Sequence, residues 1–149
     1  MSVLLGIDLG TSSVKAMLAD SESGATLGVG NVAYDVDIPK PGYAEQSPEG
    51  WYKALISTLA SLRENCPREF DAISAIGLSG QLHGLVLTEE IDECVRPAIN
   101  WLDQRSKRQL SEIYDMVSID EMRLTFKNRV ASGFAFPSLL WVREEEPDV

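Results

Sequence analysis

The sequence predicts an α/β fold, and three features of the chain lead to this prediction. Short apolar and β-branched runs separated by turn residues fill residues 1–36, a pattern typical of antiparallel strands. Apolar residues recur at helical spacing between residues 48 and 66, and a compact β-rich run follows over 72–78. Together these features predict a three-stranded antiparallel meander, a crossover helix and a strand that returns parallel to the first.

The meander is expected to consist of strands over residues 3–8, 14–19 and 25–36. A tight Gly/Thr/Ser turn separates the first two strands, and the segment 20–24 separates the second from the third. The Pro-Lys-Pro-Gly sequence at 39–42 then interrupts the pattern and is expected to be a loop.

The crossover helix is expected to begin at Ser47-Pro48-Glu49. Serine can cap a helix, proline suits the first helical position, and glutamate favours the positive end of the helix dipole. Pro67 is expected to close the helix, after which residues 72–78 form the returning strand.

The remainder of the chain alternates strand-like and helix-like segments, without an internal repeat, a linker or a low-complexity tract. A sheet with so few later strands looks unfinished. The expected elements are a strand over 85–88, an acidic turn over 89–93, an extended segment over 97–101, and helices over 103–117, 119–126 with Ser118 as its cap, and 136–146, which Pro147 ends.

A chain of 149 residues has room for one domain, and its 44% hydrophobic and 24% charged residues are typical of a globular protein. Its apolar runs are too short to cross a bilayer and no signal peptide is recognisable, so we expect a cytoplasmic protein. The wide spacing of Cys66 and Cys94 excludes a CxxC site, and two reduced thiols are favoured over one disulfide.

The formal net charge of −10 argues against nucleic acid or an anionic membrane as a partner. It also means that a general positive field could not hold a phosphorylated ligand. Backbone N–H groups and a divalent cation would have to hold such a ligand instead.

The turn from Asp8 to Ser13 offers this combination. Gly10 permits a backbone path closed to other residues, so that successive N–H groups can converge on an anion, and Thr11 and Ser12 add hydroxyl donors. The Asp8 carboxylate at the end of the strand could hold Mg²⁺ directly or through a water molecule. The alternative is a plain hairpin turn, because Gly, Thr, Ser and Asp are all common turn residues.

The sequence GIDLGTSSVK at residues 6–15 resembles the first phosphate-binding hairpin of the actin-like ATPase superfamily. GLSGQLHG at 77–84 and RPAINWLDQR at 96–105 are similar to the FGGY family of carbohydrate kinases, and within it look most like the xylulokinases. GYAEQSP at 42–48 and LLWV at 139–142 continue the resemblance in the expected order, so that it covers essentially the whole chain. It implies an actin-like ATPase (ribonuclease H-like) domain.

This resemblance implies transfer of the γ-phosphoryl group of Mg-ATP to a hydroxyl of a xylulose-type sugar. It implies that Asp8 helps to organise Mg²⁺ and the terminal phosphate, and that Gly10, Thr11 and Ser12 contact ATP phosphate oxygens. Lys15, whose direction the strand pattern does not determine, is interpreted as a solvated lysine.

The resemblance further implies that Gln81, Leu82, His83 and Gly84 line the sugar pocket. Leu82 stands where methionine is usual, an exchange that conserves volume. His83 is the only histidine of the chain. We favour its binding to a sugar hydroxyl over a purely structural hydrogen bond, because glycines place it in a loop at a strand end.

Trp101 and Asp103 follow the family's Trp-x-Asp pattern. The resemblance implies that the indole face covers the C–H surface of the sugar and that the carboxylate accepts its hydroxyls. A core position is the alternative for Trp101. Trp51 and Trp141 are interpreted as packing residues, and Arg105 as the member of a solvated basic helix face that is worth testing for function.

Two segments depart from the family pattern. Residues 126–128 read Phe-Lys-Asn where Thr-Gly-Asn is common, and Ser138 stands where lysine is frequent. Asn128 stays a candidate for the sugar pocket.

The resemblance implies that residues 1–149 form the N-terminal portion of the first domain of a longer chain, without its second domain and without its catalytic base. We therefore expect the chain alone to be inactive, and its half-built sheet to expose edges that promote self-association. The alternative is a truncated, non-catalytic sugar-binding or interaction module. The segments 81–84 and 101–103 disfavour an actin-like ATPase that is not a kinase.

Overall fold

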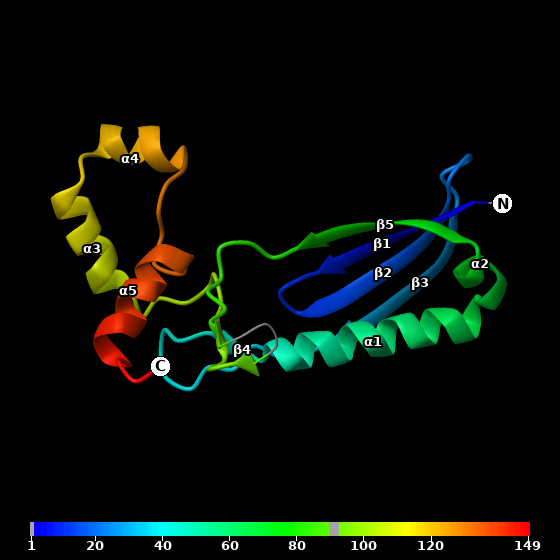
Figure 1. The fold of residues 1–149 in the computed structure, drawn as a ribbon, viewed down its shortest axis with the longest axis horizontal. Helices are drawn as coiled ribbons and strands as arrows, with labels where there is room; N and C mark the ends of the chain where they lie inside the picture. Colours follow the sequence, from blue (N-terminus) through cyan, green and yellow to red (C-terminus); the bar gives the residue numbers. More distant parts are fainter. Residues whose placement is uncertain (1, 90–92) are drawn as a thin grey trace. The chain divides into compact units, whose positions relative to one another are not determined.

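A computed structural model describes residues 2–89 and 93–149 of the chain (Figure 1). These residues form two compact units. The first unit contains Met1–Asp35 and Glu49–Gln81, and the second contains Val36–Pro48 and Leu82–Val149.

The first unit is built on a four-stranded sheet (Figure 1). Its strands are β1 (Val3–Leu9), β2 (Ser13–Asp20), β3 (Thr26–Ala33) and β5 (Ile73–Gly80). They lie in the order β3-β2-β1-β5, with β2 antiparallel to both of its neighbours and β5 parallel to β1. The predicted meander and the returning strand are therefore confirmed.

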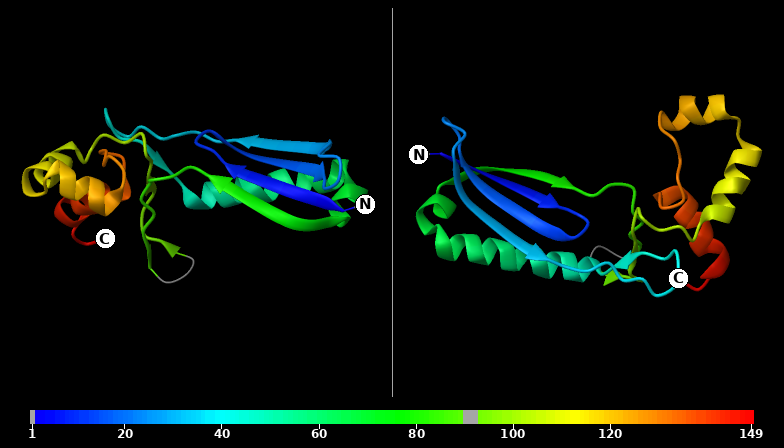
Figure 2. Two further views of the ribbon diagram at one scale, coloured as in Figure 1. Left: turned by 90° about the horizontal axis from the view of Figure 1, so that it is seen from above. Right: turned by 180° about the vertical axis from the view of Figure 1, so that it is seen from behind.

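Helix α1 (Pro48–Asn65) lies along one face of this sheet (Figure 2). Leu62 of the helix belongs to the same buried cluster as Leu18 of β2. On β3, Gly30 leaves room for the helix, because a Cβ atom there would lie only 3.0 Å from Cγ2 of Thr58. The apolar spacing thus correctly predicts a helix that seals the core of the first unit.

A short helix, α2 (Pro67–Asp71), follows α1 after a single residue. Pro67 was expected to close the helical region, but it instead occupies the first turn of this second helix. Proline is tolerated there because the first N–H groups of a helix have no partner within the helix.

The outer edge of β5 is open. Within the described residues no strand pairs with this edge, because β5 is the last strand in the order of the sheet. The register places Ile76 and Leu78 on the same face as Leu5 and Ile7, the face that α1 lies on. Ile76 and Leu78 are nevertheless 61% and 79% exposed, so the core reaches Ile73 at the start of β5 but does not cover these two residues.

The second unit contains short strand pairs instead of a broad sheet. Of the strand expected over 85–88, the structure has an antiparallel bridge between Leu85 and Ile99, and Thr88 as the first residue of a two-residue strand. The middle of the predicted acidic turn, residues 90–92, lies outside the described residues. The strands are β4 (Glu45–Gln46) paired with β8 (Ala98–Ile99), and β6 (Thr88–Glu89) paired with β7 (Glu93–Cys94).

Three helices complete the second unit: α3 (Lys107–Met116), α4 (Ile119–Phe126) and α5 (Ala135–Glu145). Helix α3 begins four residues later than the predicted start at Asp103. The side chain of Asp103 accepts a hydrogen bond from the Arg105 N–H at 2.7 Å, which holds this segment in a turn.

No helix among the described residues is long and apolar enough to cross a membrane. Cys66 and Cys94 both carry free thiols.

Candidate functional site

The turn between β1 and β2 has a compact backbone. The Gly10 N–H donates to the Ser13 carbonyl at 3.0 Å, which closes the turn around Thr11 and Ser12. The prediction that Gly10 follows a backbone path closed to other residues is wrong, because its φ is not positive. Glycine instead supplies space, since a Cβ atom there would lie 3.2 Å from the Ser13 carbonyl oxygen and 3.6 Å from Oδ2 of Asp8. The Asp8 carboxylate therefore lies beside the turn.

Tyr34 braces this turn, and the sequence gives no signal that distinguishes it. Its hydroxyl donates to the Gly10 carbonyl, and its N–H donates to the Ser12 carbonyl at 3.0 Å. Burial raises the pKa of the Tyr34 phenol above its ordinary value, and the negative charge of Asp8 raises it further. The turn thus has a second layer of support from the residue that follows β3.

Asp8 has polar neighbours on both adjacent strands. In the register of the sheet it lies opposite Lys15 on β2 and opposite Ser79 on β5. Directly paired residues point to the same face of a sheet, so the three side chains share the face opposite to that of Leu5. Lys15 is exposed, as the interpretation as a solvated lysine requires, but it is also the cross-strand neighbour of Asp8.

The chemistry of the Asp8 region suits a loosely held Mg²⁺. Among the described residues no group of three or more His, Cys, Asp or Glu side chains could hold a metal ion. One carboxylate fits a Mg²⁺ that takes its other ligands from water and phosphate oxygens. Thr11 and Ser12 belong to the turn that follows Asp8 in the chain.

A second group of candidate residues lies on three loops of the second unit. The imidazole of His83 stacks on the ring of Phe134, with centroids 3.8 Å apart and planes inclined by 6°. A Cβ atom on Gly133 would lie 2.0 Å from the carbonyl oxygen of Trp101. The loops that carry His83, Trp101 and Phe134 are therefore in contact, although the sequence gives no sign that Phe134 takes part.

Three of the predicted sugar-binding residues are accessible. His83 is exposed, and its φ of 69° lies in the left-handed region that residues with side chains seldom adopt. Trp101 is 43% exposed, so the alternative of a core position does not describe it. Leu82 is 70% exposed, and Gln81 is half-buried in the first unit, where its N–H donates to Leu9 at 2.8 Å.

Asp103 is fully buried, and its carboxylate is already hydrogen-bonded. Oδ2 accepts the Ala44 N–H at 2.6 Å, and Oδ1 accepts the Arg105 N–H at 2.7 Å. The Arg105 guanidinium lies 2.9 Å from Oδ2. These contacts favour a role in holding its loop, and a contact with sugar stays a prediction for this residue.

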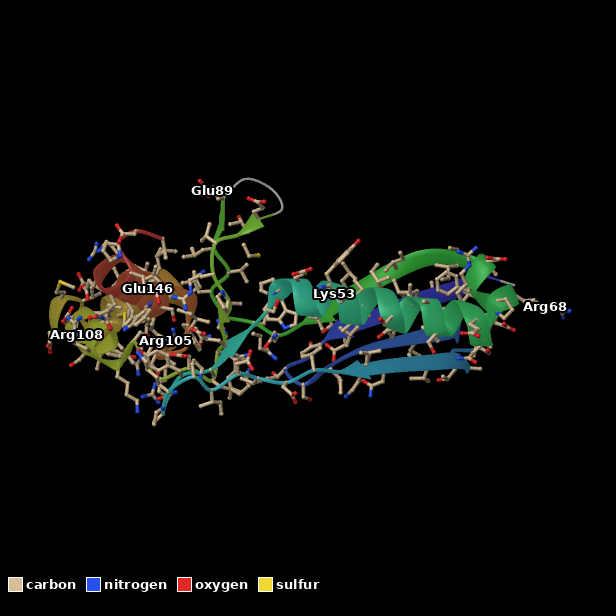
Figure 3. The ribbon with its side chains drawn as sticks, turned by 90° about the horizontal axis from the view of Figure 1, so that it is seen from below. Lys53, Arg68, Glu89, Arg105, Arg108 and Glu146 are labelled. Carbon is tan, nitrogen blue, oxygen red and sulfur yellow. The ribbon has the colours of Figure 1, made fainter. Side chains whose placement is uncertain are left out.

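Arg105 does not lie on a solvated helix face, which corrects the interpretation of this residue, whereas its basic neighbours Lys107 and Arg108 are exposed on α3. Figure 3 labels Arg105 among the side chains of the second unit. Its side chain is 1% exposed and bonds Glu45 at 2.7 Å as well as Asp103. The guanidinium also lies over the rings of Tyr43 and Trp141, 3.9 and 4.9 Å from their centroids. Burial lowers the pKa of Arg105, but its hydrogen bonds with Asp103 and Glu45 outweigh this effect and leave it raised.

The two departures from the family pattern differ in their surroundings. Ser138 is fully buried, and its hydroxyl donates to the Ser132 carbonyl at 3.3 Å. Asn128 is exposed and accepts the N–H of its neighbour Arg129 at 2.8 Å. Its place in a sugar pocket stays a prediction.

The structure thus brings Asp8, Gly10, Thr11 and Ser12 together in the first unit, and His83, Gly84, Trp101 and Asp103 together in the second.

A family model of the FGGY family of carbohydrate kinases, N-terminal domain, matches residues 3–149. The chain is 41% identical over 149 residues to a xylulose kinase of Lactococcus lactis, with 100% of this chain and 29% of the relative covered. It is 38% identical over 149 residues to a xylulose kinase of Bacillus subtilis, covering 100% of this chain and 30% of that relative.

A solved structure also matches nearly the whole of this chain with less than a third of its own length. The crystal structure of a xyloylose kinase from Brucella ovis has a TM-score of 0.91 and 42% sequence identity, and covers 98% of this chain and 30% of that chain. The chain therefore spans less than a third of the length of these relatives.

Proposed function

Because the chain belongs to the FGGY family of carbohydrate kinases, we propose that it supplies the N-terminal portion of the first domain of an ATP-dependent kinase for a xylulose-type sugar. The names of the relatives favour this substrate class, since those from Lactococcus lactis and Bacillus subtilis are xylulose kinases. In this proposal the first unit holds the phosphate end of the nucleotide, and the second holds the sugar.

In the first unit, Asp8 would hold Mg²⁺ directly or through water, and Mg²⁺ would neutralise charge on the phosphates of ATP. Thr11 and Ser12 would donate to phosphate oxygens from the β1–β2 turn. Gly10 keeps the turn compact enough for Asp8 to lie beside it, since a Cβ atom at this position would lie 3.6 Å from Oδ2 of Asp8. Positioning and charge neutralisation supply most of the catalysis in phosphoryl transfer.

In the second unit, His83 and Trp101 would contact the sugar. The observation that carries this part of the proposal is their exposure on two loops that are held together through Gly133 and Phe134. An imidazole can exchange hydrogen bonds with hydroxyl groups, and an indole face suits the C–H surface of a sugar. We assign no general base to this chain, so binding of sugar by the isolated chain is expected without turnover.

Isothermal titration of the chain with D-xylulose tests this assignment. We expect the wild-type chain to bind, and His83→Ala to bind about tenfold more weakly because it loses hydrogen bonds to hydroxyls. Lys107→Ala, at an exposed position of α3, is the matched control and should bind like the wild type. A wild-type chain that does not bind D-xylulose would overturn the sugar site and leave the family membership standing.

We also propose that the isolated chain associates with a second copy along the open edge of β5. The strand sequence Ile-Ser-Ala-Ile-Gly-Leu-Ser-Gly contains no charge and no proline that would protect the edge. It is also nearly symmetric about Gly77, so that antiparallel pairing of two copies centred there would place Ile76 opposite Leu78 in both directions. Such pairing would bring four exposed aliphatic side chains together on one face.

A further inference from the structure

We propose that Phe134 is a positioning residue of the sugar site, which holds the imidazole of His83 in one orientation for hydrogen bonds to hydroxyl groups. This inference rests on the proposed sugar site. It is carried by the stacked rings, with centroids 3.8 Å apart and planes inclined by 6°.

His83 has little other support for its ring. Among the described residues, no hydrogen bond or ion pair of its imidazole accompanies the stack with Phe134. The residue is exposed, and its left-handed backbone, with φ of 69°, is a conformation that a side chain disfavours. An exposed imidazole on such a loop would sample several rotamers if one of its faces were not covered.

Phe134, in contrast, belongs to a segment that several backbone contacts hold in place. It is the N-cap residue of α5, its N–H donates to Ala131 at 3.0 Å, and its carbonyl accepts the Ser138 N–H at 3.1 Å. The residue before it, Gly133, lies so close to the Trp101 carbonyl that a Cβ atom would lie 2.0 Å away. Phe134 is therefore held by its backbone and by the Trp101 loop, and it can serve as the fixed member of the pair.

Hydrogen bonds from buried hydroxyl groups also hold the segment that leads to Phe134. The Ser132 carbonyl accepts hydrogen bonds from the hydroxyl groups of Ser106 and Ser138, and all three residues are buried. The Ser132 hydroxyl donates in turn to the Asp103 carbonyl at 3.3 Å. Hydrogen bonds thus connect the Trp101–Asp103 loop with the segment that carries Phe134, and the imidazole of His83 stacks on this connected segment.

The geometry of the stack leaves Nδ1 and Nε2 of the imidazole accessible for hydrogen bonds. Parallel stacking covers a ring face, whereas Nδ1 and Nε2 lie at the ring edge and direct their hydrogen bonds in the ring plane. In the neutral imidazole one nitrogen donates and the other accepts. A ring held at a fixed tilt therefore presents one donor and one acceptor in a defined plane, which suits a ligand with several hydroxyl groups.

The test uses the fact that His83 is the only histidine of the chain. Its Cε1–H and Cδ2–H nuclear magnetic resonance signals are therefore unique, and stacking on Phe134 should shift them upfield. In Phe134→Leu we expect this shift to disappear and affinity for D-xylulose to fall about fivefold, as the loss of an aromatic pair predicts. Phe134→Tyr keeps a ring and should preserve both the shift and the affinity.

Phe136→Leu is the matched control, because Phe136 is a second accessible aromatic residue of the same helix, 44% exposed. It should leave the His83 signals in place, and well-dispersed amide spectra will show that each variant is folded. The inference is overturned if Phe134→Leu leaves the His83 signals at their upfield, wild-type positions, or removes the upfield shift without weakening binding. If the wild-type chain does not bind D-xylulose, the proposed function fails, and the His83 signals by themselves then decide whether Phe134 orients the ring.

Discussion

For a single residue, a sequence pattern can identify a candidate for function, whereas contacts with other residues determine where its side chain points. The Trp-x-Asp pattern draws attention to Trp101 and Asp103, but it does not determine where their side chains point. The indole is 43% exposed, whereas the carboxylate is fully buried. Direction follows from contacts with distant residues such as Ala44, which donates to Asp103 across 59 positions of sequence. Such contacts leave no local trace in the sequence.

Breaking the buried ion pair of Asp103 and Arg105 should strongly lower the free energy of unfolding. Asp103→Asn removes a carboxylate with an exposed fraction of 0% from a guanidinium with 1%, and leaves the buried positive charge only partly compensated. We expect the free energy of unfolding of the second unit to fall by about 3 kcal/mol. Urea titration followed by tryptophan fluorescence measures this change.

Asp115→Asn, at an exposed position of α3, is the control for this variant and should change stability by less than about 0.5 kcal/mol. An Asp103→Asn chain as stable as the control would show that the pair contributes nothing to the fold.

At the scale of elements, local signals are reliable where local hydrogen bonds decide the structure. The helix predicted over 119–126 with Ser118 as its cap is confirmed with the same bounds. The Ser118 hydroxyl accepts the Glu121 N–H at 3.3 Å, and the Glu121 carboxylate accepts the Ser118 N–H at 3.0 Å. The start of α3 was predicted wrongly, because the side chain of Asp103 competes for the backbone there.

This capping box predicts a pH dependence for α4. Hydrogen bonds from the Ser118 hydroxyl and N–H lower the pKa of Glu121 below its ordinary value. A depressed pKa in the folded state contributes stability that is present above the ordinary value of about 4.3 and lost as the pH falls through the lower, folded value. Protection of the α4 amides from hydrogen exchange should therefore decrease in this acidic range.

Glu121→Gln keeps an acceptor for Ser118 but cannot titrate, so this part of the pH dependence should vanish in that variant. Glu64→Gln, at an exposed position of α1, should retain it. Equal acid sensitivity of α4 in the two variants would exclude Glu121 as its source.

At the scale of the whole molecule, the order of elements was easier to predict than their grouping. The meander, the helix and the parallel strand follow from periodicity and from the handedness of crossovers. The division into two units does not, because it depends on residues 45–46 pairing with 98–99, far along the chain. The β1–β2 turn and the loops of His83 and Trp101 were predicted from the sequence as candidate sites, whereas the supporting contacts of Tyr34 and Phe134 were not.

The open sheet predicts association of the isolated chain. Leu78→Lys places a charge on the exposed edge strand and should convert a concentration-dependent dimer into a monomer in sedimentation velocity. Leu124→Lys is a closely matched control in the second unit, because the two leucines are 79% and 78% exposed. It should leave the dimer intact.

Added salt should strengthen the dimer, since it screens repulsion between chains that each carry a formal charge of −10. A wild-type chain that stays monomeric at high concentration would contradict pairing along β5.

The parallel pairing of β1 with β5 also shapes how the first unit folds. The hairpins that join β1, β2 and β3 bring together neighbouring segments, whereas Val3 pairs with Ile73 only after the whole intervening chain has been enclosed. Closing so long a loop costs conformational entropy before it gains contacts, and non-local pairing of this kind slows folding. We therefore expect β5 to dock after the transition state, so that weakening β5 accelerates unfolding and leaves the folding rate nearly unchanged.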